Sequence, residues 1–216
     1  MTPTPKLSLG LLLTASAGFI DAIGFVELGG FFISFVSGNT TQLGAALANG
    51  SVPVALITAS LILLFFIGSF AGAALALLNR RWAASAVLAL VLLAMALSLL
   101  LSATGFTPAQ AMLALAIAAG AQNAILTSQG SVRLGATFVT GTMVAAAQDL
   151  ARALRGQAPP WRWLQHLLVW ASLLAGAALG AAGHHAIGVY ALIAPFAIYA
   201  AFLIAFTLSG PRTLEA

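Results

Sequence analysis

The sequence has no cysteine and very few charged residues. Of its 216 residues, 8 are basic and 4 are acidic, so charged side chains make up 6% of the chain, whereas a soluble domain carries about 25%. The absence of cysteine excludes disulfides, thiolate metal sites, iron–sulfur ligation and cysteine nucleophiles. The scarcity of charge and a mean hydropathy of +1.08 exclude a water-soluble globule. The chain is therefore expected to be an integral membrane protein.

Motifs for catalysis, metal binding and nucleic-acid binding are also missing. The sequence has no His-Glu-x-x-His, no Gly-x-Ser-x-Gly and no phosphate-binding loop. His166 and the pair His184-His185 are too scattered for a metal site, which needs several converging ligands. Eight dispersed basic residues form no patch that could follow a phosphate backbone. We therefore expect no enzyme activity, no metal, no cofactor and no nucleic-acid partner.

Six apolar stretches are long enough to cross a bilayer, because a helix needs roughly 20 apolar residues to span about 30 Å of hydrocarbon. They cover residues 8–27, 54–78, 83–103, 109–128, 164–183 and 187–208. Strands with open edges would leave backbone groups unpaired in lipid, so helices are favoured. The expected fold class is all-α integral membrane, with one membrane domain over residues 1–216.

Two further stretches, 31–50 and 134–152, are interrupted by polar residues. If both enter the membrane and return to the same side, with the N-terminus inside, all eight basic residues are cytoplasmic, as the positive-inside rule favours. If both span, five are cytoplasmic; if only 31–50 spans, with the N-terminus outside, seven are. We therefore expect two re-entrant half-helices and cytoplasmic N- and C-termini. The basic residues are Lys6, Arg80, Arg81, Arg133, Arg152, Arg155, Arg162 and Arg212.

The first apolar stretch has one alternative interpretation. Lys6, the following leucine-rich run and Ala15-Ser16-Ala17 also fit a secretory signal peptide with its cleavage site. Cleavage there would remove half of the first span. A short charged start before a first transmembrane helix gives the same pattern, and we favour that interpretation.

The chain carries an internal duplication. Gly18-Phe19-Ile20-Asp21-Ala22-Ile23 recurs as Gly120-Ala121-Gln122-Asn123-Ala124-Ile125, Phe35-Val36-Ser37-Gly38-Asn39 recurs as Phe138-Val139-Thr140-Gly141-Thr142, and Gly68-x-x-x-Gly72 matches Gly176-x-x-x-Gly180. The pattern predicts two repeat units, 8–104 and 109–208. Each unit has three spans, so the second enters from the opposite face. These are 3+3 inverted-topology repeats, an arrangement that places transporter sites near the midplane.

The Gly-Phe-x-Asp-Ala block beginning at Gly18 and the Ser-Gly-Asn-Thr block beginning at Ser37 resemble the YoaK-like family of uncharacterised bacterial membrane proteins. The resemblance covers nearly the whole chain. It implies a polytopic protein of the bacterial plasma (inner) membrane and leaves the activity open.

Asp21 lies within the first span, where an ionised carboxylate costs on the order of 3 kcal/mol. One interpretation is a proton- or cation-binding group that changes protonation during transport. The other is structural: the carboxylate caps the free N–H groups of the half-helix that starts near Gly38. The matching residue in the second unit, Asn123, can form hydrogen bonds but cannot titrate.

The function favoured by this pattern is a transporter or channel for a small solute or ion, and proton coupling through Asp21 is one form that it can take. Gly38 and Gly141 would allow backbone turns or close helix approach, and neighbouring hydroxyls and amides would act as ligands. The alternative is a non-transporting scaffold or subunit that packs through its glycine-spaced faces, which also suggest a homo-oligomer. The predicted pathway is lined by Asp21, Ser37, Gly38, Asn39, Thr40, Asn123, Thr140, Gly141 and Thr142.

Overall fold

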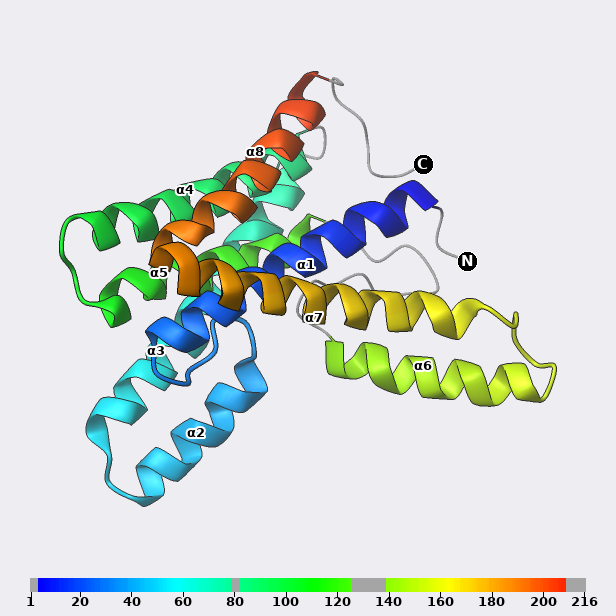
Figure 1. Ribbon diagram of the computed structural model, residues 1–216, viewed down its shortest axis with the longest axis horizontal. Helices are drawn as coiled ribbons and strands as arrows, with labels where there is room; N and C mark the ends of the chain where they lie inside the picture. Colours follow the sequence, from blue (N-terminus) through cyan, green and yellow to red (C-terminus); the bar gives the residue numbers. More distant parts are fainter. Residues whose placement is uncertain (1–3, 79–81, 126–138, 209–216) are drawn as a thin grey trace.

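A computed structural model describes residues 4–78, 82–125 and 139–208, and all regular elements in these ranges are helices (Figure 1). Arg80, Arg81, Arg133 and Arg212, and the ends of two predicted stretches, lie outside the described residues. In chain order the elements are α1 (Thr4–Glu27), α2 (Val36–Ala48), α3 (Val52–Leu78), α4 (Ala83–Ala103), α5 (Pro108–Ala121), η1 (Gln122–Ala124), α6 (Val139–Leu154), α7 (Arg162–Ile187), η2 (Gly188–Leu192) and α8 (Ile193–Leu208).

The described part of the chain has four stretches that are long and apolar enough to cross a membrane: Leu7–Glu27, Val52–Leu77, Ala83–Ala103 and Arg162–Leu208. The first three match predicted spans to within a few residues. The fourth covers 47 residues and contains two predicted spans, because it includes both α7 and α8. This confirms an all-helical, membrane-embedded fold.

Two predicted helix boundaries are wrong. The stretch 109–128 was expected to be one helix, but α5 ends at Ala121 and continues as the 3-10 turn η1. The stretch 187–208 was also expected to be continuous, whereas α8 starts at Ile193. Gly188 ends α7 with φ +62°, a left-handed conformation that glycine adopts without steric cost. The following 3-10 turn η2 then leads into α8.

The two interrupted stretches form short helices. Helix α2 has 13 residues and α6 has 16, which at 1.5 Å per residue gives about 20 Å and 24 Å. Neither length reaches across about 30 Å of hydrocarbon. Figure 1 shows both helices leading away from the centre of the molecule, each beside the first part of the following helix, α3 or α7. Both elements are shorter than a bilayer is thick, as half-helices are, but α5 with 14 residues and α8 with 16 are equally short, so length alone does not distinguish half-helices from spans.

Helices α1 and α7 run parallel and touch through glycine. A Cβ added at Gly180 would lie 2.8 Å from the Cα of Phe19, and one added at Gly176 would overlap the backbone of Ala15. From the other side, Gly18 meets the backbone of α7 at Leu173. Only glycine lets the two backbones come this close.

Helices α3 and α5 also run parallel and touch each other through glycine. A Cβ at Gly72 would lie 2.8 Å from the carbonyl oxygen of Ala121, one at Gly68 would overlap the backbone of Ile117, and Gly120 meets the backbone of α3 at Phe65. The glycine-spaced faces are thus covered by helices of the same chain. The scaffold alternative had these faces pack helices or partners, and in this structure they pack helices of the same chain.

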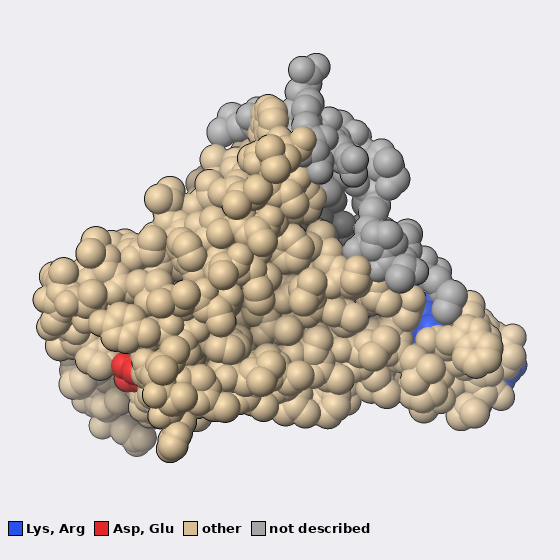
Figure 2. Space-filling model, turned by 45° about the horizontal axis from the view of Figure 1, so that its top comes forward, with Lys and Arg blue, Asp and Glu red and all other residues tan. Residues whose placement is uncertain are grey.

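The charged groups that Figure 2 shows among the described residues lie near two ends of the molecule. Basic groups lie at the end formed by the α6–α7 hairpin, and an acidic group lies near the opposite end. The exposed apolar side chains of α3 include Leu63, Phe66 and Phe70. This distribution is the one expected of a protein surrounded by lipid.

Candidate functional site

Asp21 holds the loop between α1 and α2. Its Oδ1 accepts hydrogen bonds from the backbone N–H of Ile33 at 2.7 Å and of Ser34 at 2.8 Å. The chain reverses after α1 at Gly29 and Gly30, which have φ +67° and +108°. Because Asp21 lies six residues before the end of α1, the loop returns about 9 Å along that helix. The segment that leads into α2 therefore lies beside α1 and not beyond its C-terminal end.

The structural role predicted for Asp21 is right in kind but wrong in its partners. We expected the carboxylate to cap the first turn of the half-helix near Gly38. It binds the two N–H groups just before α2 instead, and the N-cap residue Phe35 makes no side-chain cap hydrogen bond. The reversal at the paired glycines brings the loop to Asp21 before the helix begins.

Asn39 holds the same loop from the other side. Its amide oxygen accepts the N–H of Phe32 at 3.1 Å, and its Nδ2 donates to the carbonyl oxygen of Phe32 at 2.6 Å. Gln42, one turn further along α2, donates to the carbonyl oxygen of Gly30 at 3.1 Å. Asn39 is 1% exposed, so this predicted ligand is used to position the loop.

The start of α6 lines two pockets, which it shares with α2 or with the loop before α2. The α7-side pocket has a volume of about 300 Å³ and contains residues from α1, the loop that ends at the N-cap residue Phe35 of α2, the start of α6, and α7. The two half-helix N-termini carry partial positive charge, which favours acceptor groups nearby. The α7-side pocket is lined by Asp21, Phe32, Ser34, Phe35, Val139, Thr140, Met143, Trp170 and Leu173.

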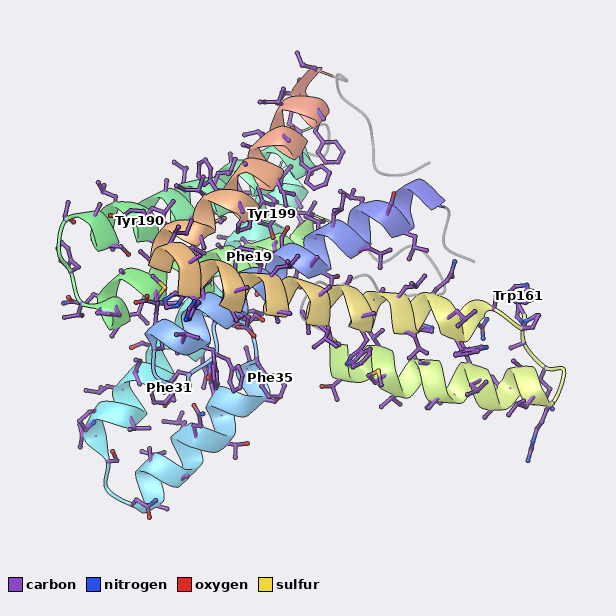
Figure 3. The ribbon with its side chains drawn as sticks, viewed as in Figure 1. Phe19, Phe31, Phe35, Trp161, Tyr190 and Tyr199 are labelled. Atoms are coloured by element: carbon purple, nitrogen blue, oxygen red, sulfur yellow. The ribbon has the colours of Figure 1, made fainter. Side chains whose placement is uncertain are left out.

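The α3-side pocket has a volume of about 570 Å³ and shares Ser34, Phe35 and Thr140 with the first. Two further residues that the sequence predicted for the site, Ser37 and Gly141, also line this pocket. Figure 3 shows Phe35 at the inner end of α2, where the two half-helices approach. The complete lining is Ser34, Phe35, Val36, Ser37, Ile62, Phe65, Phe66, Ser69, Thr140 and Gly141.

The two pockets use corresponding positions of α7 and α3. Trp170 and Leu173 lie six and three residues before Gly176, and Ile62 and Phe65 lie six and three residues before Gly68. Gly176 packs against α1 and Gly68 against α5, the first helices of the two predicted repeat units, so these lining positions correspond in the predicted repeat.

Other predicted residues are not brought into the pockets. The hydroxyl of Thr40 donates to the carbonyl of Val36 in its own helix. Asn123 donates to the carbonyls of Ala119 and Gly120 and lines neither pocket. Thr142, buried in α6, corresponds to Asn39 in the repeat and also lies outside both linings.

Gly38 and Gly141 were predicted to allow backbone turns or close helix approach, and neither makes a backbone turn. Gly38 and Gly141 both lie inside the first turn of a helix and do not have positive φ. Gly38 is needed for close approach instead, because a Cβ there would overlap the ring of Phe35 and lie 3.2 Å from Phe32. Gly141 has open space around its Cα among the described residues, which is consistent with its place in the lining of the α3-side pocket.

Sequence reasoning missed the aromatic part of the site. Phe32, Phe35 and Trp170 line the α7-side pocket, and none was proposed as a site residue. The repeat contained a signal for Trp170, because it stands at the same distance from Gly176 as Ile62 does from Gly68. Ser34 could have been found from its place directly before the duplicated Phe-Val motif.

A second polar cluster joins α6 to α7, away from the pockets. Arg162 donates from Nε to Oδ2 of Asp149 at 2.6 Å and from Nη2 to Oδ1 at 2.5 Å. Arg152 and His166 each lie 3.3 Å from the same carboxylate. The hydrogen bonds from Arg162 hold the pKa of Asp149 below its ordinary value of 3.8. Arg152 lies three residues from Asp149 on the same helix, whereas Arg162 and His166 lie across the hairpin from it.

A third contact joins the far ends of α1 and α7. His184 Nε2 lies 2.6 Å from Glu27 Oε1, although the two residues are 157 positions apart. The pair follows from the parallel course of the two helices.

The fold and the site together define a polytopic, all-helical membrane protein with two short helices whose first turns line a common pocket. The chain belongs to the family described as "Protein of unknown function (DUF1275)", which it matches over residues 9–205. It is 32% identical over 208 residues to the UPF0700 transmembrane protein RA0705 of Rhizobium meliloti (strain 1021), covering 92% of this chain and 89% of the relative.

A second relative is the UPF0700 transmembrane protein YoaK of Bacillus subtilis (strain 168). It is 28% identical over 153 residues, which is 66% of each chain. These matches confirm the resemblance to the YoaK-like membrane proteins that the motifs suggested. No solved structure matches the chain significantly.

Proposed function

We propose that this protein is a transporter or channel for a small solute or ion, with its pathway through the junction of α2 and α6. The observation that carries the proposal is that the start of α6 lines two pockets, of about 300 and 570 Å³, together with the loop before α2 in the first and with the first turn of α2 in the second. Transporters place solute sites where discontinuous helices from two halves meet. Such a junction costs backbone hydrogen bonds, so it is tolerated in lipid only where it lines a cavity.

We propose further that the two halves are inverted-topology repeats. The parallel pair α1–α7 and the parallel pair α3–α5 use corresponding glycines, and the hairpins α2–α3 and α6–α7 also correspond. One rotation would thus place repeat unit 8–104 on repeat unit 109–208 and the second on the first. Helices α2 and α6 would then point to opposite membrane faces. The six spans of the proposal are α1, α3, α4, α5 with its continuation, α7 and α8.

The proposed orientation has the N-terminus and the α6–α7 hairpin in the cytoplasm. The parallel course of α1 and α7 puts the start of α1 on the same side as Arg162, and Arg152 and Arg155 lie on the same hairpin. Basic residues collect on the cytoplasmic side of a plasma membrane. A reporter fused to either terminus and active only in the cytoplasm is expected to be active, and an inactive one would contradict the orientation.

Within this proposal, Asp21 couples the loop before α2 to the site. Its carboxylate binds the N–H groups of Ile33 and Ser34 and also lines the α7-side pocket. A proton or cation that binds the carboxylate would compete with those N–H donors for its charge. Binding would then weaken the two hydrogen bonds that hold the loop before α2. Asp21 is therefore the residue through which a bound proton or cation would change the loop.

The experiment is solute flux into proteoliposomes for a panel of small neutral and monovalent solutes. We expect the protein to raise the flux of at least one solute above that of empty vesicles. Thr140→Phe, at the position shared by both pockets, is expected to reduce this flux. Thr41→Phe is the control, because Thr41 is exposed, lines neither pocket and bonds its own helix. Absence of flux for every solute, or equal loss in both variants, would contradict the proposal.

The role of Asp21 has its own test. Asp21→Asn keeps an oxygen that can accept the two loop N–H groups but removes the titratable charge. The variant is expected to fold and to lose the pH dependence of flux. Loss of folding together with no flux in the parent protein would favour a purely structural carboxylate.

A further inference from the structure

The α7-side pocket combines one carboxylate with three aromatic side chains. Asp21 is the one charged residue of its described lining, and Phe32, Phe35 and Trp170 are the aromatic ones. The rings of Phe32 and Phe35 meet edge to face, with centroids 5.2 Å apart. Phe35 and Trp170 remain 41% and 39% exposed. Their aromatic surfaces are therefore accessible beside the carboxylate.

The carboxylate of Asp21 can accept a further donor. Both backbone hydrogen bonds end on Oδ1, the Ser34 hydroxyl also donates to the carboxylate, and the two oxygens together offer about four lone-pair sites. A bound group that removes water from the pocket must satisfy the remaining acceptor capacity, since an unpaired buried charge is costly. An anion or an apolar molecule would leave that capacity unsatisfied, and a positively charged donor would satisfy it.

The α3-side pocket offers an internal comparison. It uses the corresponding positions of the other half, but Ile62 stands where the first pocket has Trp170, and its described lining has no charged residue. The residue that matches Asp21 in the repeat is Asn123, which bonds its own helix. The α7-side pocket therefore differs from its counterpart by a carboxylate and an indole. These are the two groups that bind an organic cation by ion pairing and by cation–π attraction.

We propose that the α7-side pocket binds a small organic ammonium cation, with its charge on Asp21 and its alkyl groups against Trp170, Phe32 and Phe35. The proposal names the substrate class of the transport site and rests on the function proposed above. A bare metal ion fits the lining less well, because hard cations need several oxygen ligands and aromatic rings supply none. The volume of about 300 Å³ matches the small end of ligand pockets.

The test is equilibrium binding of radiolabelled choline to the purified full-length protein in lipid nanodiscs, without any transport step. Saturable binding is expected. Dimethylbutanol, in which carbon replaces the charged nitrogen, is expected to compete at least about tenfold more weakly than choline. Asp21→Asn and Trp170→Leu are each expected to weaken binding by about tenfold or more. Phe65→Leu, the aromatic deletion in the α3-side pocket, is the matched control and should leave binding unchanged.

The possible outcomes separate this inference from the proposed function. Absence of saturable choline binding, or equal competition by dimethylbutanol, overturns the cation site even if a neutral solute is transported. Equal weakening by Phe65→Leu and Trp170→Leu overturns its location. Choline binding with the expected variant pattern supports the site, and it does so even if the flux experiment shows no transport and the proposed function fails.

Discussion

Replacing one glycine in each parallel helix pair tests the packing of the whole fold. At Gly180, an added Cβ would lie 2.8 Å from the Cα and 2.9 Å from the carbonyl carbon of Phe19. At Gly72, it would lie 2.8 Å from the carbonyl oxygen and 3.0 Å from the Cα of Ala121. An ordinary van der Waals contact is 3.4 to 4 Å. Each helix pair must therefore separate by up to about 1 Å.

The expected magnitude follows from two opposing terms. Overpacking a well-packed contact costs about 1–3 kcal/mol, and alanine is intrinsically better than glycine in a helix by about 1 kcal/mol. Gly44→Ala in α2 measures the second term alone, because a Cβ there has no neighbour within 4 Å. Relative to that control, Gly72→Ala and Gly180→Ala should each be destabilised by about 1–3 kcal/mol.

The assay is thermal unfolding in one detergent, followed by intrinsic fluorescence. For a chain of this length, 1 kcal/mol corresponds to about 2–4 °C in Tm, so each variant should unfold roughly 2–12 °C below Gly44→Ala. The two changes lie in different helix pairs and should be additive. Variants at Gly72 and Gly180 that are as stable as Gly44→Ala would refute the close contact of α3 with α5 and of α1 with α7.

Three further predictions concern the polar contacts. Asn39→Leu removes both hydrogen bonds to the loop before α2 and should cost about 2–4 kcal/mol; unchanged unfolding would contradict this role. Because its pKa is lowered in the folded state, Asp149 should stabilise the α6–α7 hairpin above pH 3.8 and lose this effect as the pH falls through the lowered value. Arg162→Gln should move the acid unfolding midpoint to higher pH, and an unmoved midpoint would argue against the pair. Gln122→Leu leaves the buried hydroxyl of Tyr199 without its acceptor and should destabilise by about 1–3 kcal/mol, much of which Tyr199→Phe should restore in the double variant.

The helices were largely predictable from local composition. The stretch 83–103 coincides with α4, and 8–27 and 54–78 differ from α1 and α3 by a few residues. An apolar run of sufficient length forms a helix in lipid whatever its neighbours are. The two errors, at the end of α5 and the start of α8, occur where the helix breaks within an apolar run. There a backbone turn, which hydropathy does not record, sets the boundary.

The candidate site was predictable in part. Four of the residues predicted to line the pathway, Asp21, Ser37, Thr140 and Gly141, line the two pockets; a polar residue in an apolar segment needs a protein or water neighbour. Asn39 was predicted to line the same pathway as a ligand, but its amide binds the loop backbone. A residue type shows that a hydrogen bond is required, and the backbone around it decides which partner supplies it.

The amino-acid sequence by itself determined that this is a helical membrane protein with two interrupted segments, since both conclusions depend on sums over neighbouring residues. Only the tertiary structure decided which helices touch. The contacts of Gly18 with Leu173 and of Glu27 with His184 join residues more than 150 positions apart. Helices that are apolar on nearly every side carry little record of the face that meets protein and the face that meets lipid. The close backbone contacts that select these faces exist only once the helices are packed.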